Sequence, residues 1–199
     1  MTKTIDYFFS LGSPWSFIGL DAFVELAKSH QLAIRPFPTT LIEENGGIYS
    51  KNRPEPRRAY WMKDLKRWSK LRGKALLLEN RPALLDPTPS SFMVIAAGID
   101  GQDWIGLTRA LQEAFWFRAE NIGDPEIRRS IADKAGYNGA ALLAREQEAD
   151  IQARWRDNHE AARVGGVFGF PTYRYDGEVY WGQDNLPFLE RHLKGELVA

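Results

Sequence analysis

The chain has 199 residues, 44% of them hydrophobic, and its 26 basic residues balance its 26 acidic ones. This length is enough to bury a core, and the balanced charge produces no overall field that would recruit nucleic acid or a membrane surface. The absence of cysteine excludes disulfides, thiolate metal ligands and catalysis by a thiol of the protein itself.

Other patterns narrow the class of protein further. The first nine residues, MTKTIDYFF, lack the apolar run and small-residue cleavage site of a signal peptide. No stretch approaches the roughly 20 apolar residues of a membrane span. The three histidines, at positions 30, 159 and 192, have no spacing typical of a metal site. We therefore expect a soluble, cytoplasmic protein without a metal, a nucleic-acid partner or a membrane.

The first 40 residues are typical of a strand-helix-strand unit. Residues 5–9 are β-branched and aromatic, which predicts a short buried strand. An apolar helical period then begins after Pro14 and predicts a helix over residues 14–30, and residues 32–37 alternate like a second strand. Two strands joined by one crossover helix lie parallel in a sheet.

The segment between the first strand and the first helix, LGSPWS, has two interpretations. Ser13 precedes Pro14, so the simple interpretation is an N-cap followed by proline at the first helical position. The alternative is that Ser13 and Ser16 occupy the two cysteine positions of a C-P-x-C redox site. Such a site uses a helix N-terminus because that position stabilises a thiolate. For Ser16 we favour the role of an ordinary first-turn polar residue.

The middle of the chain, residues 41–164, is predicted to be almost entirely helical. A loop with two central glycines leads into it, and a second loop, residues 76–91, contains three prolines and is long enough to line a pocket. Helices are predicted over residues 58–71, 90–98 and 104–118. A further helix is predicted to start at Asp124-Pro125, and the chain is predicted to be continuously helical over residues 138–164.

After Gly165 the sequence becomes strand-like again. Residues 172–175 and 178–181 form a predicted hairpin around Asp176-Gly177, followed by an amphipathic helix for which Asp184 is the expected N-cap. Combined with the N-terminal unit, this gives a four-stranded mixed sheet. The predicted fold class is therefore α/β, a thioredoxin-like fold from residues 1–40 and 165–199, with a large all-helical insertion at residues 41–164.

Three phrases carry a resemblance to a known family. FFSLGSPWSFIG, GVFGFPTY and WGQDNL occur in the order and spacing of the 2-hydroxychromene-2-carboxylate isomerases. That family belongs to the DsbA-like branch of thioredoxin folds and is related to kappa-class glutathione transferases. The resemblance covers nearly the whole chain and implies glutathione as a bound cofactor. We also expect a homodimer.

The resemblance implies roles for individual residues. Ser13 matches the family's catalytic serine, which donates a hydrogen bond to the glutathione thiolate. Phe170 and Pro171 match the cis-proline element, whose backbone binds the peptide part of glutathione, although the residue pattern alone favours a trans bond. Relatives carry a smaller residue at Phe170. Asp184 matches the acid that holds the γ-glutamyl amino group, and Asn52 a family asparagine near the site.

Several of these positions keep a structural alternative. Asp184 is equally well explained as a helix N-cap, and Asn52 as a solvated loop residue. Asn185 stands where many relatives have arginine, so the site carries one charge fewer. In the substrate pocket, the alternatives for Tyr60, Trp61 and Trp68 are stacking on an aromatic substrate and packing in the core. For Arg57 and Lys63, the alternatives are binding a substrate carboxylate and lying on the solvated surface.

The function implied by the resemblance is glutathione-dependent cis-trans isomerisation of 2-hydroxychromene-2-carboxylate-type aromatic catabolites, by reversible thiolate addition and elimination. A kappa-class-like glutathione transferase is the close alternative. A third possibility, from a different class, is a thioredoxin-like binding module without catalytic activity. Glutathione binding distinguishes the first two from the third.

Overall fold

The structure is a computed structural model that describes residues 3–196. Four strands form one mixed sheet in the order β2-β1-β3-β4. The first two strands pair in parallel, and the other two pairs are antiparallel, which confirms the predicted sheet. The strands are β1 (Thr4–Phe9), β2 (Ala33–Pro38), β3 (Thr172–Tyr175) and β4 (Glu178–Trp181).

The central strand β1 is buried on both faces, and its aromatic side chains organise the core. The Tyr7 ring stacks on Phe9 with centroids 4.5 Å apart and on Tyr173 of β3 at 5.6 Å, while Phe8 on the other face stacks on Phe37 at 4.6 Å. Strand residues alternate between faces, so consecutive aromatic residues fill both layers. This explains why the segment reads as a continuous apolar run and not as an alternating one.

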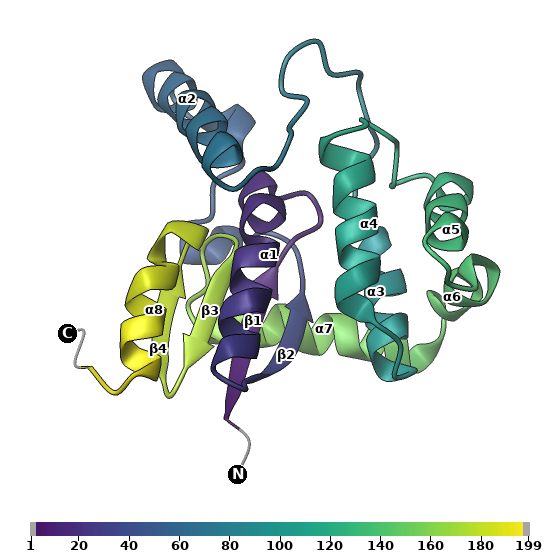
Figure 1. Cartoon of the computed structure of the whole chain (residues 1–199). Helices are drawn as coiled ribbons and strands as arrows, with labels where there is room; N and C mark the ends of the chain where they lie inside the picture. The colour runs from purple at the N-terminus through teal and green to yellow at the C-terminus, as the bar shows by residue number, and fades with distance from the viewer. Residues whose placement is uncertain (1–2, 197–199) are drawn as a thin grey trace.

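Helices cover both faces of the sheet. Helices α1 (Pro14–Ser29) and α8 (Leu186–Leu193) lie on one face, and α7 (Ala149–Val164) crosses the opposite face (Figure 1). Helix α7 is fixed there by the buried Asn158, whose side-chain amide donates to the Pro38 carbonyl oxygen of β2 at 3.2 Å. The last helix of the predicted insertion therefore belongs spatially to the sheet.

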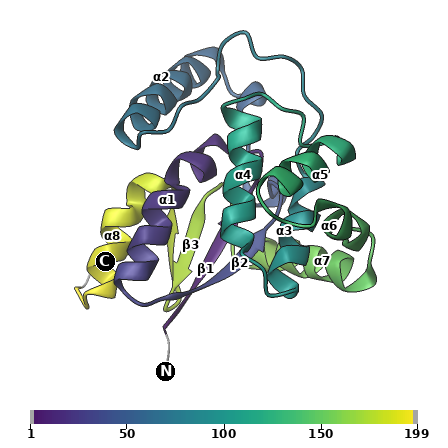
Figure 2. The ribbon, with the colours of Figure 1, turned by 45° about the vertical axis from the view of Figure 1, so that its right-hand side comes forward.

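The remaining helices form two separate groups. Helices α3 (Ser90–Ile99), α4 (Trp104–Trp116), α5 (Pro125–Lys134) and α6 (Gly139–Arg145) pack together beside the sheet, and α2 (Glu55–Leu71) lies apart from them, above α1 (Figures 1 and 2). The 3₁₀ turns η1 (Glu43–Asn45) and η2 (Ser50–Asn52) lead into α2. Leu65 is its buried residue, and Arg72 at its C-terminal end donates to the Gln183 side chain at 2.8 Å. The predicted domain limits at residues 1 and 199 lie outside the described residues.

Two helix predictions need correction. The continuous helix over residues 138–164 is wrong, because α6 ends at Arg145 and α7 begins at Ala149. Glu146 causes the break: its carboxylate is buried and accepts hydrogen bonds from Arg128 of α5 at 2.8 and 2.6 Å. The second correction concerns the start of α2. This helix begins at Glu55, three residues before the predicted start, because Pro56 is accommodated in its first turn.

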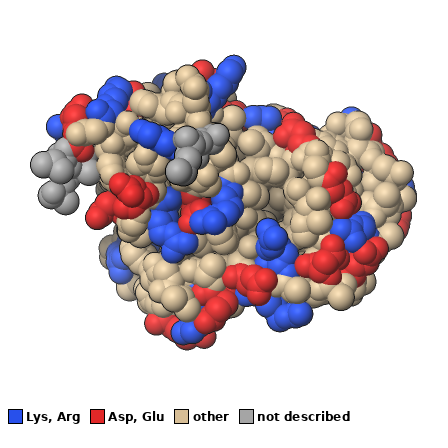
Figure 3. Space-filling view, turned by 90° about the horizontal axis from the view of Figure 1, so that it is seen from below, with Lys and Arg blue, Asp and Glu red and all other residues tan. Residues whose placement is uncertain are grey.

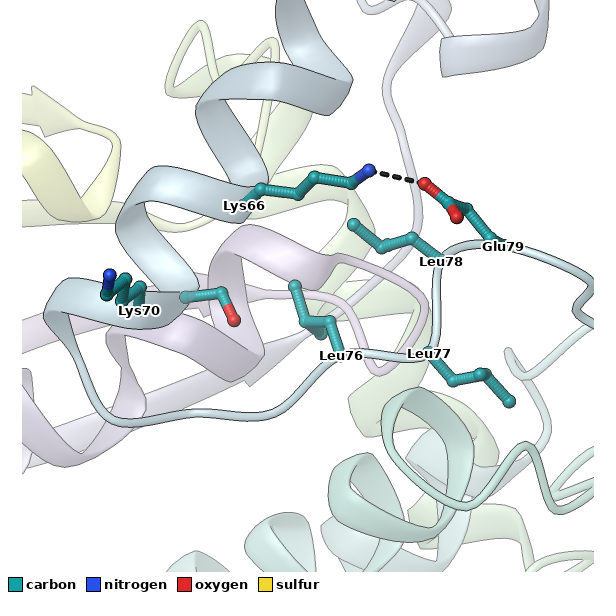
Figure 4. Close-up of a pocket in the computed structure, with 7 residues that line it drawn as sticks. Lys66, Lys70, Leu76, Leu77, Leu78 and Glu79 are labelled. Carbon is teal, nitrogen blue, oxygen red and sulfur yellow. Dashed lines mark hydrogen bonds and ion pairs between the residues drawn. The ribbon is translucent and has the colours of Figure 1, made fainter.

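The chain between α2 and α3 forms the predicted proline-containing loop. It turns back along α2, where Glu79 forms an ion pair with Lys66 and the Lys74 carbonyl accepts a hydrogen bond from Ser69 (Figure 4). The same stretch of the loop also contacts α4, where the Leu77 N–H donates to the Trp116 carbonyl at 2.8 Å. It therefore connects the two groups of inserted helices.

The surface carries both signs of charge. On the face shown in Figure 3, basic and acidic side chains are interspersed, and neither sign forms a continuous patch. Within residues 3–196, no helix combines the length and the apolar character needed to cross a bilayer.

Candidate active site

A cavity of about 1020 Å³ opens beside the N-terminal end of α1. Segments far apart in the sequence line it, since the sheet, α2 and α4 each contribute one wall. The lining residues belong to the ranges 10–15, 40–64, 81–88, 115–116 and 168–185.

Ser13 caps α1 as predicted and also contacts the loop before β3. Its Oγ accepts a hydrogen bond from the Ser16 N–H at 3.2 Å and donates one to the Phe170 carbonyl oxygen at 3.2 Å. The first turn of α1 contains no acidic side chain. The positive end of the helix dipole therefore faces the cavity uncompensated, and an anion beside Ser13 is stabilised by both the dipole and the hydroxyl.

The Phe170–Pro171 peptide bond is cis, which confirms the prediction. The Phe170 carbonyl accepts from Ser13, and the Pro171 carbonyl accepts from the Gly182 N–H at 2.8 Å. Within the described residues the Phe170 N–H has no hydrogen-bond partner. The upstream Val167 is buried in the core with Phe8.

Asp184 is not the N-cap of the last helix, which corrects the sequence prediction. It lies in the 3₁₀ turn η3 (Gln183–Asn185), and α8 begins one residue later, at Leu186, without a side-chain cap. The turn follows Gly182, whose φ of 92° favours glycine. The Asp184 carboxylate is exposed and lines the cavity. The Asn185 side-chain amide donates to the Trp181 carbonyl at 2.6 Å, so it braces the same turn.

Asn52 is exposed on η2 and is not among the residues that line the cavity. Its neighbour Arg53 does line it, together with Arg57 on the first turns of α2. Burial and the nearby Arg57 charge lower the pKa of the Arg53 guanidinium. Sequence reasoning did not identify Arg53; the only available signal was its place beside Asn52 in the phrase KNRP.

Some of the aromatic and basic candidates of α2 line the cavity, and others lie outside it. Tyr60, 61% exposed, and the half-buried Trp61 line the cavity, with the Arg53 guanidinium 5.9 Å from the Trp61 ring. Trp68 lies outside it and stacks with Arg72, and Lys63 is also outside the lining. Of the five candidates, Arg57, Tyr60 and Trp61 therefore have access to a ligand in this cavity.

Ser16 points into the protein, not into the cavity. It is fully buried, and its hydroxyl makes no hydrogen bond within residues 3–196. Burial raises the pKa of the neighbouring Tyr7 phenol well above its usual range. Ser16 is therefore a buried polar residue of the first turn of α1, the role favoured from the sequence.

The arrangement suits a thiolate supplied by a ligand. It combines a helix N-terminus, a serine hydroxyl and a cis-proline loop, but the chain has no cysteine. Within the described residues no group of three or more His, Asp or Glu side chains is placed to hold a metal ion. Fold and site together define a thioredoxin-fold protein with a serine at the N-terminus of α1 and no thiol of its own.

Comparison with known proteins identifies the family. A sequence model of the DsbA-like thioredoxin domain matches residues 4–194. The chain belongs to this DsbA-like thioredoxin family.

Three relatives extend the comparison. A 2-hydroxychromene-2-carboxylate isomerase of Sphingobium xenophagum is 30% identical over 97% of this chain and 99% of its own. Human glutathione S-transferase kappa 1 is 26% identical over 98% of this chain and 92% of its own. A solved structure of 2-hydroxychromene-2-carboxylate isomerase superposes with a TM-score of 0.79 over 96% of this chain and 95% of its own, at 22% identity. The resemblance noted in the sequence is confirmed.

Proposed function

We propose that this chain is a glutathione-dependent isomerase of 2-hydroxychromene-2-carboxylate-type aromatic acids. The observation that carries the proposal is the Ser13 hydroxyl, which lies at the N-terminal end of α1 and beside the cis-proline loop. The chain has no thiol of its own to occupy this place. The name of the 30% identical relative supports the reaction class.

The residues around the cavity fit the groups of glutathione. Asp184 offers a carboxylate without an ion-pair partner among the described residues to the γ-glutamyl amino group. The free Phe170 N–H beside Pro171 is available to the peptide backbone. Arg53 and Arg57 suit a terminal carboxylate, and Asn185 braces the Asp184 turn, whereas Asn52 lies outside the lining. The amino group, the peptide backbone and one carboxylate of the cofactor thus each have a partner of suitable charge or a hydrogen-bond donor.

When bound, glutathione supplies a thiolate that adds reversibly to the conjugated double bond of the substrate. Ser13 donates its hydroxyl proton toward the sulfur, and the first turn of α1 adds its positive dipole end. Both effects favour the ionised form, because they stabilise the charge and not the neutral thiol. The aromatic walls of the cavity exclude water and orient a flat ring.

The test is turnover of 2-hydroxychromene-2-carboxylate with a substoichiometric amount of glutathione. We expect many equivalents of substrate to be isomerised per glutathione, with no thioether product by mass spectrometry. S-methylglutathione is the matched control, because it keeps the amine and the carboxylates but has no ionisable thiol. The isomerase proposal is wrong if free glutathione falls one-for-one with substrate.

The similarity to human glutathione S-transferase kappa 1 makes a transferase the second candidate. It uses the same thiolate, but the product leaves with glutathione attached. A stable adduct in the mass spectrum would support this function. A protein that binds no glutathione by calorimetry would instead be a binding module of another kind.

A further inference from the structure

Arg81 is an arginine of the cavity wall that no sequence pattern identified. It lies on the loop between α2 and α3, and its guanidinium packs against two aromatic rings of α4, 4.3 Å from the centroid of Phe115 and 4.5 Å from that of Trp116. Its Nη2 donates to the Phe115 carbonyl and its Nη1 to the Leu77 carbonyl. Three of its five N–H donors therefore remain.

Three acidic residues line the cavity, Asp64, Asp86 and Asp184, and none of them forms an ion pair with Arg81. The Asp86 Oδ1 accepts hydrogen bonds from the N–H and hydroxyl of Thr88 at 3.0 and 2.7 Å, and Asp64 lies 3.9 Å from Arg67. No ion pair of the described residues includes Arg81. Burial lowers the pKa of Arg81, and no acidic group opposes this effect. An arginine remains charged under these conditions, so the cavity wall carries an unneutralised cation.

This wall adjoins the serine. The Trp116 indole N–H donates to the Leu11 carbonyl at 3.2 Å, and a side chain at Gly12 would approach Pro87 Cγ to 2.8 Å. The loop is anchored to α4 by the Leu77 backbone, and Figure 4 shows its first residues leaving α2. Arg81 is therefore held by a rigid support next to the residues that precede Ser13.

We propose that Arg81 is the receptor for the carboxylate of an aromatic acid substrate. This rests on the proposed function and assigns Arg53 and Arg57, at the α2 side of the cavity, to glutathione. A guanidinium presents paired N–H donors that match a carboxylate, and the flanking rings reduce its hydration. The same rings, Phe115 and Trp116, offer apolar surface to the aromatic part of the ligand.

The experiment compares two probes by titration calorimetry: 2-hydroxycinnamate and its neutral amide. They share ring and double bond and differ only in the charge that Arg81 is proposed to bind. We expect the wild type to bind the acid about tenfold or more tightly than the amide, as for a charge-assisted pair. Arg81→Gln should remove this preference, and Arg81→Lys should restore part of it.

Two matched controls use other arginines. Arg118→Gln changes an arginine outside the cavity lining that pairs with Glu113, and should leave the preference unchanged. Arg57→Gln changes the competing cavity arginine. Equal affinity of the wild type for both probes, including no measurable binding of either, overturns the proposal. So does a preference that survives Arg81→Gln and disappears in Arg57→Gln.

Glutathione binding is measured separately on the same proteins. If the wild type binds no glutathione but Arg81 still selects the acid, the proposed function fails and the carboxylate receptor stands. If glutathione binds normally to Arg81→Gln and the acid preference is unchanged, the receptor assignment fails while the proposed function is unaffected. Normal glutathione affinity in Arg81→Gln also shows that the variant is folded.

Discussion

The Ser13 hydroxyl has a single proton to donate. In the structure it donates to the Phe170 carbonyl oxygen, while its oxygen accepts from the Ser16 N–H. In the proposed complex, a thiolate in the cavity would replace the Phe170 carbonyl as the acceptor, and the cap on α1 would be kept. Because a charged acceptor binds a hydroxyl more strongly than a carbonyl does, the exchange favours the ionised sulfur.

We therefore expect Ser13→Ala to raise the thiol pKa of bound glutathione by about 1 to 2 pH units. The measurement is the ultraviolet thiolate absorbance of the complex against pH. Ser13→Thr keeps both the hydroxyl and the cap and should titrate like the wild type. If the thiol pKa is unchanged in Ser13→Ala, Ser13 acts only as a helix cap.

At the scale of elements, the position of Asp184 depends on the contact between α1 and η3. Gly19 of α1 lies against η3, and a methyl group there would clash with the Cβ of Gln183. Gln183 is fully buried and also receives the Arg72 side chain from the end of α2. One residue without a side chain thus allows α1, η3 and α2 to meet.

Gly19→Ala should displace η3 and with it Asp184. We expect a loss of about 1–3 kcal/mol in the free energy of unfolding, as for overpacked cores. Glutathione affinity should fall as well, measured by calorimetry below the unfolding transition.

Gly98→Ala is the control for this substitution. Gly98 is exposed on α3, and its added methyl would be 3.9 Å from the nearest side-chain atom. Since alanine favours a helix over glycine by about 1 kcal/mol, this variant should be at least as stable as the wild type. If Gly19→Ala and Gly98→Ala are equally stable, η3 accommodates the added methyl group without loss of stability, and the prediction is wrong.

At the scale of the whole molecule, the cavity joins segments that are distant in sequence. Residues 10–15, the α2 region and residues 168–185 approach one another only in the folded chain. A ligand that contacts all three binds the native state and not the unfolded one, so it stabilises the entire fold.

Glutathione at 100 times its Kd should therefore raise the Tm by roughly 5 to 10 °C for a chain of this size. Scanning calorimetry with and without the ligand measures this. Cysteinylglycine, which lacks the γ-glutamyl amino group, should produce a smaller shift. Asp184→Asn should reduce the difference between the two ligands; an undiminished difference would remove Asp184 from the binding site.

The sequence alone determined the strands, most of the helices and the start of α1. Local rules were sufficient for these, because Pro14 after Ser13 specifies an N-terminus and Asp176-Gly177 a hairpin whatever surrounds them. The order of strands then restricted the sheet to few topologies. The similarity to a known family supplied the candidate site residues, all of which lie in three short phrases except Asn52.

Only the tertiary structure decided which of those residues share a cavity. The break at Glu146 comes from Arg128, 18 positions away, and the exclusion of Asp184 from the helix cap comes from the turn at Gly182. Arg81 lies in an irregular loop, where no periodicity predicts the direction of a side chain. Its environment is created by Phe115 and Trp116, more than 30 residues later, and such non-local contacts leave no signal in the local sequence.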